Sequence, residues 1–597
     1  MEPHLQLIDI RVIYPRAPSV ESPLVRVWGR DATGAAVVAD FPYSQHFWAA
    51  AGVPGDGMLN QLSIFAPVRR EALKNCFCRD CKPCNPYSRP WPCSKNWHGC
   101  ETVLATSTER RTPFVGYSPT PHTMTRIQVA GPWAVKLVEK ALRRHDPQCA
   151  IFEAHISAEQ RWMVDNGVTG CGWLGARSGA AAPDAGIAPL VIYCLDIECL
   201  SLSGEFPTPA RDPVITVACV VMARGCVRKQ TVFQLDTCNS SDVPGAAVFT
   251  YRTEEALLNA VYAHMREASP DIIAGYNSDH FDLPYLKRRA LNLGAAAFRY
   301  NLKDRRGLFQ WHSASTTRGS AQMGEREVTM HDIPGTVTFD VLDAIRDNHK
   351  LRSYTLNAVS EHFLGDTKDD VKYSEIAGLM ESEGGRGKLA RYCLQDTVLV
   401  ADLIEKLYLV TNAVELSKVT GTKLGDTLHR GQSLKVEANV LKTTAAHGMV
   451  LPTFHRPYGK DEVRVPFYDK VRGRIPTGQG KTGFQGATVL EPKRGFYEEP
   501  IAVLDFASLY PSIIQAYNLS HDTLVAGEAE AARMGVAVHV TPDGTCFVKE
   551  EVRKGILPTI LAELLAARKR AKQQMKQATN EFDKAVFDGK QASLVIL

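Results

Sequence analysis

The 597-residue chain has no apolar run near the ~18 residues that a membrane-spanning helix needs. It also has no strong excess of one charge, since 69 Lys and Arg residues face 65 Asp and Glu residues and give a net charge of +4. Whole-chain charge therefore favours no particular partner. The opening MEPHLQLIDIRVIY has no basic segment followed by a long apolar core, so no secretory signal is predicted. We expect an intracellular protein without membrane contact.

Internal repeats and low-complexity tracts are absent as well, which argues against solenoid and fibrous architectures. The composition, with 45% apolar and 22% charged residues, is typical of globular proteins. The length leaves room for about three or four domains. A multidomain globular chain is therefore predicted.

The cysteines are unevenly distributed, because six of the fifteen lie between Cys76 and Cys100. Thiolates at CxxC spacing can converge on a tetrahedral zinc ion. The sequence thus raises the hypothesis of a structural Zn²⁺ loop, and a surface insertion with free thiols is the open alternative. The candidate ligands are Cys76, Cys78, Cys81, Cys84, Cys93 and Cys100, with His98 nearby.

The order of sequence patterns predicts at least two different folds along the chain. Residues 1–188 contain short β-like runs such as LVRVWGR and AAVVADF, and they close with a Gly-, Ala- and Pro-rich stretch that is typical of a linker. Residues 189–410 alternate apolar strands such as LVIYCL with helical patterns such as EEALLNAVYAHMRE, which favours an α/β domain. The polar stretch 311–328 is predicted to be a loop.

Four acidic residues have neighbours that suggest shared chemistry. Asp196 and Glu198 end an apolar strand at positions i and i+2, so both side chains point to the same face. Asp282 follows the turn-forming segment YNSDH, and Tyr392 and Asp396 lie at i and i+4 of a helical segment. Four such carboxylates could hold two Mg²⁺ or Mn²⁺ ions about 4 Å apart, as in two-metal nucleases. Each acid taken singly is more often an ordinary surface or turn residue.

These three stretches, in this order, resemble exonuclease motifs I, II and III of the family B DNA polymerases. The resemblance extends from about residue 150 to 591 and is strongest to the delta type, through segments such as HKLRSYTLNAVSEHFLG and VTGTKLGDTLHRGQSLKV. It implies an RNase H-like 3′–5′ exonuclease domain in which Tyr392 places a water molecule. It also implies that Asn277 and Phe281 contact a single-stranded DNA end.

Downstream, VLDFASLYPSIIQAYNL resembles polymerase motif A. The resemblance implies a buried palm strand that delivers Asp505 to catalytic metal ions, with Ser508, Leu509 and Tyr510 at the nucleotide and Tyr510 excluding ribonucleotides. The stretch FQGATVLEP resembles a template-contacting segment, in which Phe484 replaces tyrosine and Gly486 is retained. Arg568 and Lys572 match the triphosphate-binding face of the first fingers helix.

The resemblance implies a multidomain α/β and α+β protein with five parts. A β-rich N-terminal domain (1–188) carries the insertion 76–100. The exonuclease domain (189–410), a connecting segment (411–499), the first part of a ferredoxin-like palm (500–550) and the start of helical fingers (551–597) follow.

The sequence departs from the family pattern near its end, where Val595 stands in place of the expected nucleotide-binding lysine. With Asp505 as the one recognisable palm acid, we expect exonuclease activity from this chain and no synthesis. A stand-alone 3′–5′ exonuclease with a polymerase remnant, and half of a split polymerase, stay open. The implied partners are primer-template DNA, single-stranded 3′ ends and deoxynucleoside triphosphates, with a sliding clamp and accessory subunits as further candidates. The implied location is the nucleus or a viral replication compartment.

Overall fold

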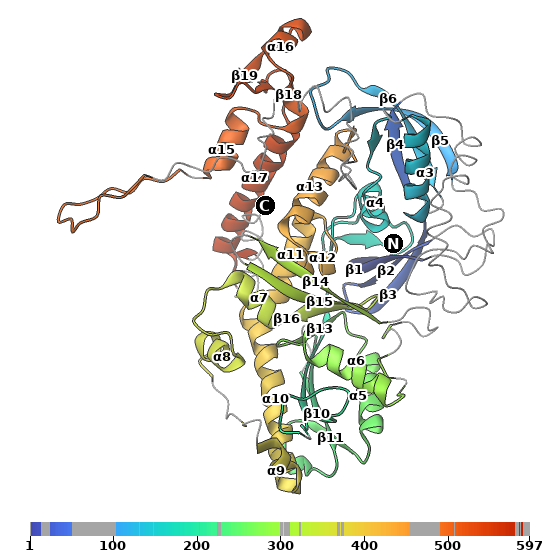
Figure 1. Cartoon of the computed structure of the whole chain (residues 1–597), viewed down its shortest axis with the longest axis vertical. Coiled ribbons are helices and arrows are strands. Elements are labelled where there is room, and N and C mark those ends of the chain that lie inside the picture. Colours follow the sequence, from blue (N-terminus) through green and yellow to red (C-terminus); the bar gives the residue numbers. More distant parts are fainter. Residues whose placement is uncertain are drawn as a thin grey trace.

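The structure is a computed structural model of the chain (Figure 1). It describes residues 2–13, 24–43, 45–50, 103–129, 132–146, 149–201, 203–223, 228–295, 297–298, 302–303, 311–320, 324–366, 371, 375–453, 490–506, 508–579, 584 and 587–588.

The N-terminal part contains two separate sheets. The first is antiparallel, with the order β3-β2-β1-β8, and the second has the order β17-β5-β6-β4-β7. The runs LVRVWGR and AAVVADF form strands of the first sheet as predicted, and the apolar side of that sheet packs on Trp162 and Met163 of α4. The elements are β1 (His4–Ile13), β2 (Leu24–Arg30), β3 (Ala36–Pro42), β4 (Gln45–Ala50), β5 (Val103–Pro113), β6 (His122–Val129), α3 (Pro132–His145), β7 (Ile151–Phe152), α4 (Ala158–Asp165), β8 (Trp173–Gly175) and β17 (Met449–Val450).

A six-stranded sheet with the order β12-β11-β10-β9-β13-β16 forms the second unit. Strand β9 lies in its interior, antiparallel to β10 and parallel to β13, and β13 is parallel to β16. This mixture of parallel strands and helices is the predicted α/β architecture. The strands are β9 (Val191–Cys199), β10 (Val214–Ala223), β11 (Lys229–Leu235), β12 (Ala247–Tyr251), β13 (Ile272–Gly275) and β16 (Val337–Asp340).

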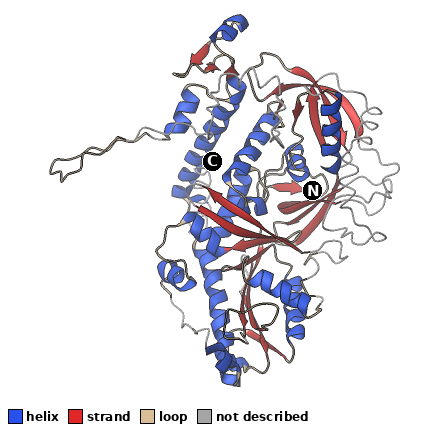
Figure 2. Cartoon of the chain, viewed as in Figure 1, coloured by secondary structure: helices blue, strands red, loops and turns tan. Residues whose placement is uncertain are grey.

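Helices cover both faces of this sheet (Figures 1 and 2). Tyr193, Leu195 and Ile197 of β9 pack with α5 and α6 on one face. Cys194, on the opposite face, packs with the long helix α10. The alternation follows from the period of two in a strand, and both faces are apolar because both are covered. The helices are α5 (Glu254–Ala268), α6 (Asp282–Asn292), α7 (Val341–Asn348), α8 (Leu356–Leu364), α9 (Ile376–Met380) and α10 (Glu383–Lys406), with the 3-10 turn η2 (Ser240–Asp242).

The stretch 311–328, which was predicted to be a loop, contains most of an antiparallel hairpin. Strands β14 (His312–Ser320) and β15 (Gly324–Asp332) pair from His312 opposite Asp332 to Ser320 opposite Gly324. The prediction was wrong because the segment is rich in Ser, Thr and Gly, whereas backbone hydrogen bonds form the ladder whatever the polarity of the side chains. The base of the hairpin is anchored on the six-stranded unit, since Lys287 Nζ of α6 donates to the Trp311 carbonyl at 2.7 Å.

Past the six-stranded unit, helices run alongside one another up the molecule (Figure 1). Helix α17 packs against α13 and α15, and a small sheet has the order β18-β20-β19. These elements are α11 (Leu409–Thr420), α12 (Leu424–His429), α13 (Gln432–Ala446), α15 (Leu509–Ala516), η4 (His521–Thr523), β18 (Leu524–Val525), α16 (Glu528–Met534), β19 (Val538–Val540), β20 (Cys546–Val548) and α17 (Ile556–Gln577).

Residues 501–506 differ from the prediction of a buried palm strand. They are not part of a strand, and Val503, Leu504 and Phe506 are exposed. Figure 1 shows the preceding segment as an arm that projects from the molecule. A strand needs neighbouring backbone to satisfy its N–H and C=O groups, and no described strand pairs with these residues.

Candidate active site

Strand β9 presents Asp196 and Glu198 on the same face of the sheet. Asp196 lies opposite Ala218 and Glu198 opposite Thr216 on β10. The intervening Ile197 points to the other face and is buried. Strand β10 pairs with β9 along both acids, whereas the pairing with β13 ends at Cys194, so the two carboxylates lie on a paired strand just past the end of β13, on one face as the i, i+2 spacing predicted.

Asp282 approaches from the turn that follows β13, where it is the first residue of α6. Its Oδ1 accepts a hydrogen bond from the Ile197 backbone N–H at 3.1 Å, so it is tied directly to β9. Asn277 in the same turn has a φ of 64°, in the left-handed region that asparagine tolerates. Phe281 is half-buried beside the acid.

Asp396 comes from α10, which lies across the sheet over β9 and β10. It is buried, with 7% of its surface exposed. One turn earlier, the Cys393 thiol donates to Oδ2 of Asp196 at 3.4 Å. Helix α10 therefore contributes an acid to the site and also a contact that orients the acid on β9.

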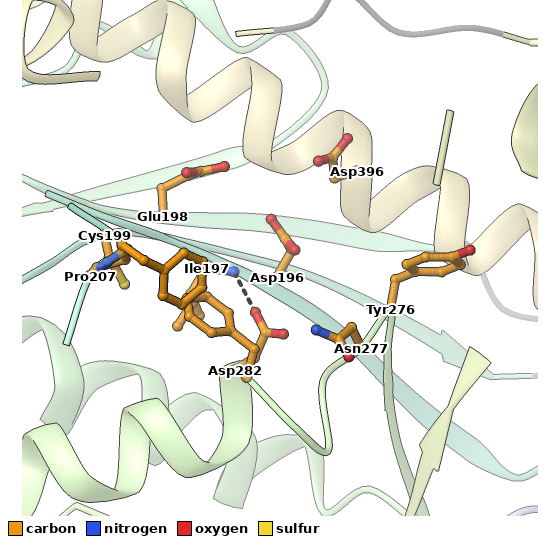
Figure 3. Close-up of a pocket in the computed structure, with 11 residues that line it drawn as sticks. Asp196, Ile197, Glu198, Cys199, Pro207, Tyr276, Asn277, Asp282 and Asp396 are labelled. Atoms are coloured by element: carbon orange, nitrogen blue, oxygen red, sulfur yellow. Dashed lines mark hydrogen bonds between the residues drawn. The ribbon is translucent and has the colours of Figure 1, made fainter. Parts of the chain in front are cut away.

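These four acids line one cavity of about 280 Å³. In Figure 3, Asp196 lies between Asp282 of α6 and Asp396 of α10, and Glu198 lies further along the strand. Segments that are far apart in the sequence thus surround one space. The lining residues are Asp196, Ile197, Glu198, Cys199, Phe206, Pro207, Tyr276, Asn277, Phe281, Asp282 and Asp396.

The crowding of negative charge in the cavity is unfavourable for the protein alone. Burial raises the pKa of Asp196 well above its usual value, and the nearby charges of Asp282, Asp396 and Glu198 raise it further. Burial raises the pKa of Asp282 to about 7, against the lowering effect of the hydrogen bond from Ile197. A cation in the cavity would oppose both effects.

The donor set suits a hard divalent cation, because all four side chains offer carboxylate oxygens, the ligands that Mg²⁺ and Mn²⁺ prefer. Within the described residues, however, no three His, Cys, Asp or Glu side chains are close enough together to hold one ion as they stand. The acids surround the cavity without converging on a point.

Other predicted residues lie elsewhere. Tyr392 is half-buried on α10 and is not among the residues that line the cavity. Asp505 and Tyr510 are exposed around the start of α15, where Ser508 is the N-cap residue and Leu509 the first helical residue. Arg568 is half-buried and Lys572 exposed on α17. The predictions for Phe484, Gly486, Val595 and the zinc candidates Cys76 to Cys100 fall outside the described residues.

The structure adds residues that the sequence patterns did not single out. Phe206 is 71% exposed, and its ring lies edge-on to that of Phe281 with the centroids 5.4 Å apart. Pro207 and Tyr276 also line the cavity. Phe206 lies between the strand-end acids and DPVI in the sequence, and no local signal marks it as a site residue, because single exposed apolar residues are ordinary on protein surfaces.

Comparison with known families agrees with this geometry. Residues 149–359 match the model of the family B DNA polymerase exonuclease domain, and residues 422–597 match the model of DNA polymerase family B. The chain belongs to the family B DNA polymerases, and it carries the exonuclease domain and part of the polymerase domain.

Within that family the chain is similar to the delta type. It is 39% identical over 487 residues to the DNA polymerase delta catalytic subunit of Glycine max, which covers 74% of this chain and 42% of that protein. It is 37% identical over 531 residues to that of Mesocricetus auratus, covering 81% of this chain and 45% of that protein. The chain thus spans less than half the length of these relatives.

The fold also matches a solved structure. The family B DNA polymerase of the archaeon Pyrobaculum calidifontis superposes with a TM-score of 0.66 at 23% identity, over 99% of this chain and 67% of that one. At this identity the likeness shows the fold. Among the described residues, no helix is both long enough and apolar enough to span a membrane.

Proposed function

We propose that this chain is the editing and nucleotide-entry part of a replicative family B DNA polymerase, and that it removes nucleotides from 3′ ends of DNA. One observation carries the proposal: β9, the start of α6 and the middle of α10 each deliver acids to the same cavity. Such an arrangement suits metal-assisted phosphodiester hydrolysis and has no evident structural role, because four like charges around one cavity, two of them buried, cost stability.

In this proposal the chain's residues divide the work. Asp196, Glu198, Asp282 and Asp396 would hold the divalent ions, and Tyr392, one turn before Asp396 on α10, would orient water. When bound, two ions supply Lewis-acid stabilisation of the attacking and leaving oxygens. Cys393 orients Asp196 through its thiol contact. Burial of the site strengthens each of these interactions.

The substrate we propose is an unpaired 3′ end. The edge-to-face pair of Phe206 and Phe281 lies at the cavity, and Asn277 is exposed next to it. Bases stack on aromatic rings with little sequence preference, which suits an enzyme that edits any mispaired end. A single strand also enters a space of this size more readily than a duplex.

For synthesis, we propose that Asp505, Tyr510, Arg568 and Lys572 belong to a nucleotide site that is incomplete in this chain. Asp505 lies in an exposed segment outside any described strand, so no strand of the described residues holds it in a fixed position. We therefore expect no primer extension by this chain alone. Nuclear location, or a viral replication compartment, follows from the replicative role and belongs to the same proposal, as do clamp and accessory-subunit contacts.

The test is a nuclease assay on the purified 597-residue chain with Mg²⁺ and 5′-labelled substrates, one single-stranded and one a primer-template. We expect shortening from the 3′ end that requires the metal, is faster on the single strand and continues when deoxynucleotides are present. Asp282→Ala should lower the rate by about a hundredfold or more.

The matched control is Asp402→Ala, on the same helix as Asp396. Asp402 does not line the cavity, and its Oδ1 forms an ion pair with Arg228 Nη1 at a distance of 2.5 Å. Its loss should change the nuclease rate less than about twofold. An unchanged rate for Asp282→Ala would refute the assignment of the site. Extension of the primer would refute the incomplete synthesis site.

A further inference from the structure

The turn of residues 276–281, between β13 and α6, has a tightly constrained backbone. A Cβ on Gly275 at its start would lie 2.5 Å from the Ser278 Cβ and 3.0 Å from the Leu195 carbonyl oxygen. Asn277 has the left-handed φ noted above. The turn also starts α6, because the Ser278 carbonyl accepts from the Leu283 N–H at 3.0 Å. The position of Asp282 therefore depends on the shape of this turn.

Asp340 contacts the turn from the neighbouring strand. It is the last residue of β16, and it lies beside Gly275 in the parallel register with β13. Its Oδ1 accepts from the Asn277 N–H at 2.9 Å and its Oδ2 from the Asp279 N–H at 3.2 Å. The same Oδ1 accepts from the Leu342 N–H at 3.0 Å as the N-cap of α7. At 4% exposure, this carboxylate joins two turn amides to the sheet.

His331 of the hairpin contacts the backbone of the same residue, Asp279, at its carbonyl group. Trp311 Nε1–H donates to His331 Nδ1 at 3.3 Å, which leaves the His331 proton on Nε2. That Nε2–H donates to the Asp279 carbonyl at 3.0 Å. Asp279 is thus held through its N–H by Asp340 and through its C=O by His331, both of them buried.

The contacts inside the turn do not satisfy all of its buried polar side-chain atoms. Ser278 Oγ and Asp279 Oδ1 are buried without a hydrogen-bond partner among the described residues. Buried polar atoms in this state disfavour the observed conformation. An unfavourable backbone conformation persists where the surrounding structure holds it in place. Among the described residues, Asp340 and His331 supply hydrogen bonds from other elements to the backbone of this turn.

We propose that Asp340 and His331 are positioning residues that together set the 276–281 turn and thereby place Asp282 in the cavity. The inference rests on the proposed nuclease function. Neither residue lines the cavity, and both act through the backbone of Asp279, Asp340 at its N–H and His331 at its C=O. Through His331, the hairpin therefore helps to set the position of Asp282, one of the proposed metal ligands.

Asp340→Asn separates the turn contact from the helix cap. Asparagine is a good N-cap residue, and its oxygen can keep the bonds from Asn277 and Leu342. Its NH₂ group then faces the Asp279 N–H, donor against donor, so this one bond is lost. We expect the nuclease rate to fall about 10- to 100-fold, the usual range for residues that orient metal ligands.

His331→Leu removes the donor to Asp279, and His331→Gln restores an N–H at a similar reach. We expect His331→Leu to lower the rate about tenfold and His331→Gln to recover most of it. Thr253→Ala is the control, because Thr253 caps α5 through the Ala256 N–H and lies outside the cavity. This substitution removes one side-chain hydrogen bond elsewhere in the same unit and leaves the 276–281 turn unchanged.

Two readouts do not depend on activity. Mn²⁺ binding to the DNA-free chain, followed by electron paramagnetic resonance of the free ion, should weaken about tenfold in Asp340→Asn and His331→Leu. Hydrogen exchange of peptides that cover 276–281 should become about tenfold faster in these two variants. Thr253→Ala should leave both readouts at the wild-type value.

Exchange and Mn²⁺ affinity within twofold of wild type in Asp340→Asn would overturn the proposal, as would equal changes in Thr253→Ala. If the wild-type chain does not degrade DNA and Asp282→Ala changes nothing, the nuclease function fails. The exchange measurement still decides whether Asp340 and His331 set the turn. If nuclease activity is present and the turn peptides do not respond, the positioning role alone fails.

Discussion

Two segments of this chain look alike in sequence and differ in structure. VIYCLD ends at Asp196 and IAVLD ends at Asp505, so each is an apolar run that closes with an aspartate. Leu195, just before the first acid, is 1% exposed, whereas Leu504, just before the second, is 95% exposed. The first run is strand β9 between β10 and β13, and the second belongs to no described strand. Apolar patterning therefore predicts the tendency to form a strand, and neighbouring strands decide whether that tendency is realised.

The two aspartates, Asp196 and Asp505, also differ in their surroundings. Asp196 is surrounded by other acids, and burial with their charges raises its pKa. Asp505 is exposed to solvent in the segment 501–506. An acid placed on a rigid strand can be aimed at a metal ion, and one on an unpaired segment cannot.

The largest expected difference between the two segments is in backbone protection. In native-state hydrogen exchange, amides of β9 should open only with the whole unit, whereas those of 501–506 should exchange near the unprotected rate. We expect protection factors to differ by at least about 10⁴. Similar protection in both segments would mean that 501–506 is paired in solution, and the contrast drawn here would fail.

A matched pair of substitutions sharpens the comparison energetically. Leu195→Ala should lower the free energy of unfolding by about 2–5 kcal/mol, because it leaves a cavity between β9 and helices α5 and α6. Leu504→Ala should change it by less than about 0.5 kcal/mol, since the side chain is already in water. Chemical denaturation of the two variants checks this. Equal losses would show that exposure does not separate the two leucines.

The smallest expected effect is on how the free energy of unfolding changes at acidic pH. Burial lowers the pKa of His331 to about 4, below its unfolded value near 6.5, so the unfolded state binds the extra proton first. The stability of the neutral histidine is complete above pH 6.5 and is lost as the pH falls toward 4. We expect His331→Gln, which does not titrate, to lose about 1–2 kcal/mol less than wild type between pH 7 and 5. Parallel pH profiles would contradict a buried neutral His331.

Local sequence patterns predicted much of the fold. The period of two in VIYCLD predicted β9 and the shared face of Asp196 and Glu198, and the helical period around Asp396 predicted α10. Two predictions of local structure were wrong, the loop at 311–328 and the buried strand at 501–506. Both depend on whether another strand is available to pair, which composition does not reveal.

By itself, the sequence determined which residues could do the chemistry, because acids at the ends of apolar elements follow from spacing and residue type. Tertiary structure alone decided which of them meet. It brought Phe206 beside Phe281, placed Tyr392 outside the cavity lining and left Asp505 exposed. It also joined Asp340 and His331 to the turn before Asp282. The physical reason is that hydrogen bonds and burial between distant segments depend on the packing of whole elements, which no local spacing encodes.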